Sequence, residues 1–197
     1  IMIGAYTTYV VQLIFPTLIE YSLFIALPFS FLTAGFIGIL IERLIIRHLY
    51  GRPLETLLAT FGVSLFLQQL VRSIFSPINM PVSSPQWMSG MIEIHPALSL
   101  SYGRLYILAF SIIIFLFLLT LLKKSHFGIE VRAVMQNRSM ARSMGIKTNW
   151  IDSLTFGLGS GIAGIAGVAL SQITNVGPNL GQSYIIDCFM VVVFGGV

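Results

Sequence analysis

The 197-residue chain has very little charge. Charged residues make up 9% of it, whereas soluble domains carry about 25%. Hydrophobic residues make up 56%, and the mean hydropathy is +0.90. This composition excludes an ordinary soluble domain and indicates an integral membrane protein with room for about six spanning helices of ~20 residues.

Side chains that commonly carry catalysis or bind metals are also scarce. The single cysteine, Cys188, has no intrachain disulfide partner and is expected to be a small core residue. The histidines His48, His95 and His126 are far apart in the sequence, so we expect no metal site. The apolar segments hold no paired Asp or His groups and no Ser–His pair, which argues against an intramembrane enzyme. The sequence contains no Walker A loop, so any ATP hydrolysis must belong to another chain.

Six apolar segments predict an all-α fold, a polytopic transmembrane helix bundle. They cover residues 1–15, 21–41, 54–75, 105–122 and 153–173, and a last segment that starts near residue 183. The first and last segments reach the ends of the chain. We therefore expect a bundle truncated at both ends, with about six spans visible.

The basic residues predict how the bundle is oriented. Of the eleven Lys and Arg residues, three fall within 42–55 and six within 123–152, whereas 73–103 has none. By the positive-inside rule, the two basic segments face the cytoplasm, and the loops at 76–103 and 174–182 face outward. Proline recurs in the outer loop and excludes one long helix there, at Pro77, Pro81, Pro85 and Pro96.

Polar residues recur along the third apolar segment at Thr60, Ser64 and Gln68, and Gln69 adds a further amide. Polar groups in a span must face protein or water. The row therefore predicts either interhelical hydrogen bonds or a hydrated pathway for a small polar solute. Further residues are candidates for the outer mouth of such a pathway, namely Gln172, Asn175 and Asp187. A charge stabilising the start of a helix is the alternative for Asp187.

Glycines crowd the fifth apolar segment. Gly159, Gly161 and Gly164 match a dinucleotide-binding fingerprint by spacing, but that motif needs a strand before it and a helix after it. Helix packing explains the pattern better, because at 100° per residue the small residues share one face. This face includes Gly157, Gly161, Gly164 and Gly167. It is either a static contact or a surface that slides during a conformational cycle.

The basic segment 123–152 lies between two apolar stretches and predicts two short helices, at 130–136 and 138–144. Asn137 is the expected N-cap of the second helix, and Gly145 is expected just past its end. Such a folded cytoplasmic segment suits docking to a cytoplasmic subunit. The alternative is a basic loop that sets topology and contacts lipid head groups.

The run RAVMQNRSMARSMGI followed by TFGLGSGIAGIAGVAL resembles the membrane permease subunits of ABC importers of the branched-chain amino acid type. The resemblance implies one permease transmembrane domain over residues 1–197, with 123–152 as the coupling loop that engages an ATP-binding subunit. The residues that match the family's coupling motif are Arg132, Ala133, Asn137, Ala141, Gly145 and Ile146.

Residues 49–75, 87–90 and 169–197 resemble the urea-importer branch of that family. The resemblance implies a non-catalytic, multi-pass subunit in a bacterial inner membrane that translocates urea and binds no cofactor or nucleic acid. Its expected partners are the lipid bilayer, a second permease subunit in a heterodimer, cytoplasmic ATP-binding subunits that use ATP, and an extracytoplasmic solute-binding protein. Two alternatives stay open: the same architecture importing branched-chain amino acids or short amides, and a passive channel for small polar solutes.

Overall fold

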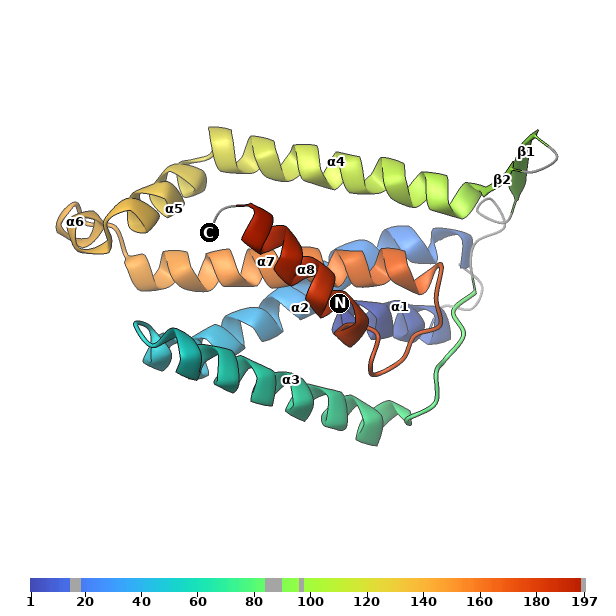
Figure 1. The fold of residues 1–197 in the computed structure, drawn as a ribbon, viewed down its shortest axis with the longest axis horizontal. Coiled ribbons are helices and arrows are strands. Elements are labelled where there is room, and N and C mark those ends of the chain that lie inside the picture. Colours follow the sequence, from blue (N-terminus) through green and yellow to red (C-terminus); the bar gives the residue numbers. More distant parts are fainter. Residues whose placement is uncertain (15–18, 84–89, 96–97, 196–197) are drawn as a thin grey trace.

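The computed structural model describes residues 1–14, 19–83, 90–95 and 98–195. It is a helical bundle (Figure 1), as predicted. The six apolar segments correspond to α1 (Met2–Ile14), α2 (Ile19–Leu44), α3 (Pro53–Phe75), α4 (Tyr102–Lys124), α7 (Thr148–Ser171) and α8 (Ile185–Phe194). Residues 87–89 of the stretch that resembles the urea-importer branch lie outside the described residues, as do Pro85 and Pro96 of the outer loop.

Within the described ranges, four helices are long and apolar enough to cross a membrane. They are Tyr21–Leu44, Leu54–Phe75, Tyr102–Lys124 and Thr148–Ser171. The other two apolar helices are shorter, because α1 has 13 residues and α8 has 10. The expected six apolar helices are therefore present, and four of them have spanning length.

Both basic segments lie at the same end of the bundle, as predicted (Figure 1). The connection from α2 to α3 contains a short helix, η2 (Ile46–Leu49), and the second segment folds as α5 (His126–Gln136) and α6 (Arg138–Ser143). We call this the basic end, and the opposite end the outer end. The segment after α3 and the start of α4 lie at the outer end, so α3, α4 and α7 alternate in direction.

The most extensive packing between described helices joins α2 and α7. All four predicted glycines of α7 are buried, and a Cβ atom added at any of them would clash with a neighbouring helix. At Gly164 the added atom would lie 2.6 Å from Ala34 Cβ and 2.8 Å from the Ser30 carbonyl oxygen of α2. At Gly167 it would lie 2.0 Å from the carbonyl oxygen of Ile1. These glycines let α1 and α2 approach the α7 backbone directly.

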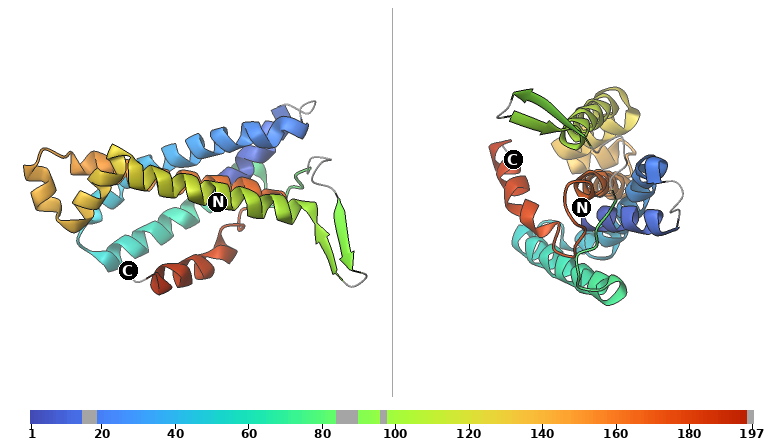
Figure 2. Two further views of the ribbon diagram at one scale, coloured as in Figure 1. Left: turned by 90° about the horizontal axis from the view of Figure 1, so that it is seen from above. Right: turned by 90° about the vertical axis from the view of Figure 1, so that its right-hand side faces the viewer.

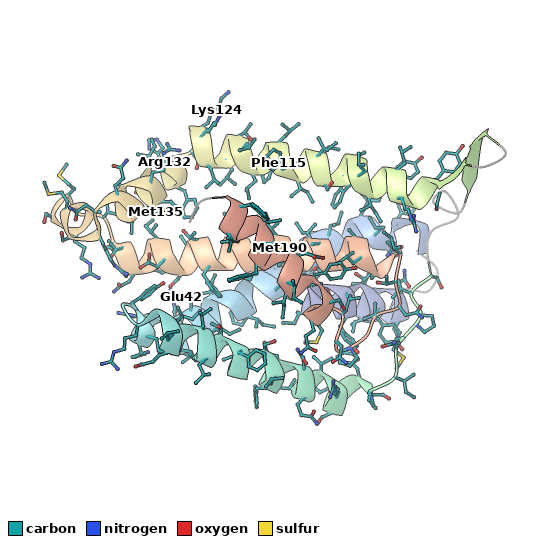
Figure 3. All side chains as sticks on the ribbon, viewed as in Figure 1. Glu42, Phe115, Lys124, Arg132, Met135 and Met190 are labelled. Carbon is teal, nitrogen blue, oxygen red and sulfur yellow. The ribbon has the colours of Figure 1, made fainter. Side chains whose placement is uncertain are left out.

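The remaining long helices lie around this contact (Figure 2, right). None of the described residues of α4 is buried, and large apolar side chains such as Phe115 and Met190 are exposed on α4 and α8 (Figure 3). Apolar surface on this scale suits lipid or a further membrane subunit. Cys188 is also exposed on α8, so its expected core position is wrong. The physical reason is that α8 lies on the outside of the bundle.

The outer loop contains a β-hairpin that the sequence did not reveal. Strand β1 (Met91–His95) pairs antiparallel with β2 (Leu98–Ser101), with an irregularity between Glu93 and His95. It leads directly into α4 at the outer end (Figure 2, left). This small sheet is an addition to the helical bundle and leaves the predicted fold class unchanged.

Changing Gly164 to Ala is expected to lower the free energy of unfolding by about 1–3 kcal/mol, because the methyl group overpacks the α2–α7 contact. Gly159→Ala is the matched control. Gly159 lies on the same helix, and a Cβ atom added there would have no neighbour within 4 Å. Thermal unfolding in detergent micelles, followed by intrinsic fluorescence, measures both variants. Equal melting temperatures for the two would contradict the close contact.

Candidate functional site

A cavity of about 310 Å³ lies beside α3 and contains part of the predicted polar row. Thr60, Ser64 and Gln68 line it from α3, and Phe156 of α7 and Ile185 of α8 line other sides. The remaining wall includes apolar residues of α2 and α3 and the segment before α8. The cavity therefore combines a few polar groups with a mainly apolar surface.

The polar groups of the cavity are neutral and partly engaged. The Gln68 amide nitrogen Nε2 donates to Ser64 Oγ at 3.3 Å, and Thr60 Oγ1 donates to the Leu57 carbonyl oxygen at 3.0 Å. The Gln68 carbonyl oxygen Oε1 and the lone pairs of the Thr60 hydroxyl can accept hydrogen bonds, and the second Nε2 proton of Gln68 can donate one. The site can therefore bind a polar solute by hydrogen bonds, and none of the described side chains that line it is charged.

The other predicted pathway residues lie elsewhere. Gln69 is exposed and does not line this cavity, because one helical step rotates it about 100° from Gln68. Gln172 lines a separate apolar cavity of about 270 Å³ between α2, α4 and α7. Asn175 and Asp187 are exposed and line neither cavity. Three of the seven predicted residues thus come together, and Gln182, which the prediction lacked, lines the same cavity.

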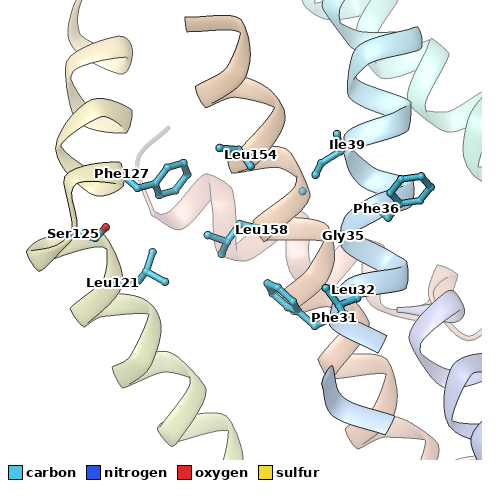
Figure 4. A pocket seen from close by; sticks show the side chains of 11 residues that line it. Phe31, Leu32, Gly35, Phe36, Ile39, Leu121, Ser125, Phe127, Leu154 and Leu158 are labelled. Atoms are coloured by element: carbon cyan, nitrogen blue, oxygen red, sulfur yellow. The ribbon is translucent and has the colours of Figure 1, made fainter. Parts of the chain in front are cut away.

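A larger cavity, of about 560 Å³, lies between α2, α7 and the junction of α4 with α5 (Figure 4). Phe31, Phe36 and Phe127 are among its apolar lining residues. Ser125 contributes a hydroxyl there, but that hydroxyl accepts from the Gly128 amide nitrogen at 3.2 Å as the N-cap of α5. An apolar lining of this kind gives a polar solute little to bind. The 310 Å³ cavity beside α3 is therefore the better candidate for a solute site.

The basic segment folds as predicted into two helices joined at Asn137. The Asn137 side chain accepts a hydrogen bond from the Met140 amide nitrogen at 3.1 Å and so caps α6. The helix ends at Ser143 with Met144 as its C-cap, and Gly145 follows with a φ of 86°, in the left-handed region that favours glycine. The Gly145 and Ile146 amides donate to the Arg142 and Ala141 carbonyls, at 3.0 and 3.1 Å, which is the Schellman arrangement.

The residues of the predicted coupling motif mainly shape this segment. Asn137 and Gly145 set the limits of α6, and Ala141 is buried with 4% of its surface exposed. Ala133 and Ile146 are half-buried. Arg132 is exposed, and its guanidinium donates to the Leu122 carbonyl oxygen at 2.7 Å, which ties α5 to the end of α4.

Sequence reasoning missed the side chains that this segment presents outward. The three methionines of α5, α6 and its C-cap are strongly exposed, at 81% for Met135, 64% for Met140 and 79% for Met144. Figure 3 shows Met135 and Arg132 on this segment. Methionine adapts its shape to a partner surface. The four-residue spacing of Met140 and Met144 on a predicted helix was the available signal.

A buried carboxylate anchors the basic end. Glu42, at the end of α2, is 1% exposed and accepts hydrogen bonds from Ser153 of α7 and from the Tyr50 hydroxyl, the latter at 3.3 Å. Tyr50 is 44% exposed. Its partial burial, followed by the nearby negative charges of Asp152 and Glu42, raises the pKa of Tyr50 to about 12. The phenol therefore stays protonated and remains a donor to Glu42.

These features define the class of the protein, a multi-pass helical membrane protein with a folded basic segment between two spans. The chain belongs to the family described as the permease component of branched-chain amino acid transport systems, because that family's model matches residues 1–197. The resemblance stated from the coupling motif and the glycine-rich span is thus confirmed at the level of the family.

Individual relatives carry the same description in their names. The chain is 29% identical over 178 residues to a probable branched-chain amino acid transport permease protein, LivH, of Methanocaldococcus jannaschii, covering 88% of this chain and 56% of the relative. It is 28% identical over 212 residues to LivH of Salmonella typhimurium, covering 100% and 66%. It is 26% identical over 211 residues to BraD of Pseudomonas aeruginosa, with the same coverage.

The chain thus spans 56% to 66% of the length of these relatives. Their names refer to branched-chain amino acids and do not support the urea-importer branch. No solved structure matches the chain.

Replacing Asn137 with Ala is expected to destabilise α6 by about 1 kcal/mol, because the Met140 amide loses its capping acceptor. Hydrogen exchange of the α6 amides should become about fivefold faster if the helix opens locally. Asn137→Ser keeps a capping hydroxyl and should restore slow exchange. Asn149→Ala, at an exposed position early in α7, is the matched control. Unchanged exchange in Asn137→Ala would contradict the capping role.

Proposed function

We propose that the chain is a membrane-spanning permease subunit of an ATP-driven importer of branched-chain amino acids in the bacterial plasma membrane. The observation that carries the proposal is the family match over residues 1–197. The capped helices α5 and α6 at the basic end and the mixed cavity beside α3 support it. The chain itself performs no bond chemistry in this function.

The cavity lining favours a substrate with an apolar side chain. Val63, Leu67 and Phe156 provide apolar surface beside the hydroxyls and amides of the polar row. A branched-chain amino acid carries an apolar side chain that this surface can bury.

Urea is the second candidate substrate, and one observation favours it. The polar residues lining the cavity are neutral hydroxyls and amides, Thr60, Ser64, Gln68 and Gln182. Neutral urea needs hydrogen-bond donors and acceptors of this kind. Its small size leaves the apolar part of the lining unused, so the branched-chain amino acid is the better match.

Energy enters from a partner subunit in this proposal. The exposed methionines of α5 and α6 form an adaptable apolar surface at the basic end, where cytoplasmic ATP-binding subunits dock. The exposed apolar faces of α3 and α4 suit a second permease subunit together with lipid. An extracytoplasmic solute-binding protein delivers the substrate to the outer end. A passive channel would leave the folded and capped docking segment without a role.

The decisive experiment is uptake of labelled leucine and labelled urea by the whole transporter in proteoliposomes. We expect leucine uptake that requires both the solute-binding protein and ATP. Uptake of urea with the same requirements would show that urea is the substrate and would leave the proposed importer mechanism unchanged. Solute movement that persists without ATP would support the passive channel instead.

Gln68→Leu is expected to lower leucine uptake by about tenfold, because it removes one hydrogen-bonding group from the solute cavity. Gln69→Leu is the matched control, since it makes the same change one residue away at an exposed position outside the cavity. The rate of uptake per amount of transporter is measured for both. Equal rates for the two variants would show that the cavity is not part of the transport pathway.

Met144→Glu is expected to reduce recovery of the ATP-binding subunit by about tenfold, because docking would bury an unpaired carboxylate. His48→Glu introduces the same carboxylate at an exposed position of η2, at the same end but outside α5 and α6. Co-purification in detergent measures both variants. Full recovery with Met144→Glu would exclude this surface as the docking site.

A further inference from the structure

Tyr50 lies where the contacts of the basic end converge. It directly follows η2 and precedes α3 by three residues. Its hydroxyl donates to Glu42 Oε1 at 3.3 Å, and the Arg138 guanidinium carbon lies 4.6 Å from the centre of its ring. The Tyr50 side chain therefore joins the end of α2 to the start of α6. Along the chain, Tyr50 lies only three residues before α3.

Arg138 connects the other side of this junction. It is the first residue of α6 and forms an ion pair with Asp152 in the second turn of α7. The same guanidinium covers the Tyr50 ring. A displacement of α6 therefore acts on α7 through Asp152 and on the α2–α3 connection through Tyr50.

Helices α2 and α7 are held together as one unit. Their backbones approach through the buried glycines, where added atoms would clash. Ser153 of α7 also donates to the buried Glu42 of α2. Close packing of this kind leaves little room for one helix to slide against the other.

Helix α3, in contrast, is held mainly at its two ends. At the basic end its strongest packing is with η2, and Thr56 Oγ1 donates to the Leu49 carbonyl oxygen at 3.1 Å. At the outer end Arg72 donates to Asn179 Oδ1 at 2.7 Å. Between these points α3 packs little on the other helices and is largely exposed. Its position beside the cavity is therefore set by its end contacts.

We propose that Tyr50 is the positioning residue through which α5 and α6 move α3 relative to the α2–α7 pair. The proposal rests on the proposed function. When a docked ATP-binding subunit displaces α6, Arg138 carries the displacement to the Tyr50 ring, and η2 passes it to the first turn of α3. The cavity wall that holds Thr60, Ser64 and Gln68 then moves against Phe156 of α7. Tyr50 acts through α3 and does not itself touch the solute.

The test uses the complete transporter with its ATP-binding subunits in proteoliposomes. Tyr50→Leu removes both the ring under Arg138 and the hydroxyl on Glu42. Tyr50→Phe keeps the ring and removes the hydroxyl alone. Tyr21→Leu is the matched control, because Tyr21 is 62% exposed at the other end of α2. The first readout is the amount of solute moved per ATP hydrolysed.

The second readout is the movement itself. Spin labels are attached at Leu58→Cys on α3 and Leu154→Cys on α7, in a Cys188→Ala background. Pulsed electron paramagnetic resonance measures the distance between the two labels with and without ATP. We expect the unsubstituted transporter and the Tyr21 variant to show an ATP-dependent change in separation. We expect Tyr50→Leu to lose that change and to move about fivefold less solute per ATP, with ATP-binding subunits still bound. Tyr50→Phe should lie between the two.

Two outcomes overturn the proposal in distinguishable ways. An ATP-dependent change that is present in the unsubstituted transporter and equally large in Tyr50→Leu removes the role of Tyr50 and leaves the importer intact. An unsubstituted transporter with no ATP-dependent change in separation and no ATP-driven uptake removes the proposed function together with this inference. If Tyr50→Leu does not fold, Arg138→Gln decides, because it keeps Tyr50 and removes the cation over its ring. An ATP-dependent change in separation and a solute yield per ATP equal to those of Tyr21→Leu would then exclude the path from α6 through the Tyr50 ring.

Discussion

The contact between α2 and α7 is the constraint on which the rest of the structure depends. Two apolar helices in lipid gain little from burying apolar side chains against each other, because lipid tails are equally apolar. Close backbone approach at the glycines supplies the packing instead, and the Glu42–Ser153 hydrogen bond fixes its basic end. With this pair fixed, α1 packs on both members, and α7 follows α5 and α6 along the chain.

The division between a rigid pair and a loosely packed α3 gives the cavity its character. Ile41 and Phe156 line it from the α2–α7 pair, and α3 lines it from another side. Residues 1–3 and the segment that leads into α8 complete the lining. A site between a fixed and a movable wall can change its shape without unfolding either helix. Three of the cavity's four neutral polar side chains, Thr60, Ser64 and Gln68, lie on α3, and Gln182 lies just before α8. Under the proposed mechanism, a movement of α3 would change the hydrogen bonds that the first three make to a solute.

Much of this architecture follows from local features of the sequence. The apolar segments locate the helices, the Lys and Arg counts place both basic segments at one end, and Asn137 and Gly145 mark the limits of α6. The rest depends on contacts between distant residues. Which of Gln68 and Gln69 lines the cavity depends on the residues that surround α3. The contact between Tyr50 and Arg138 joins residues 88 positions apart. The hairpin β1–β2 arises from strand pairing within a loop whose prolines excluded only a long helix.

The contrast between α4 and α3 bears on how the chain enters the bilayer during synthesis. Helix α4 has a hydropathy of 2.9 over its span and 0% of that window buried, whereas α3 has a hydropathy of only 1.4. A segment like α4 partitions into lipid on its own, because insertion depends on the hydrophobicity of the segment itself. Helix α3 carries hydroxyls and amides that find no hydrogen-bond partner in lipid tails, so we expect its insertion to depend more on neighbouring helices than that of α4. Helices α1 and α2 precede α3 along the chain and are therefore synthesised before it.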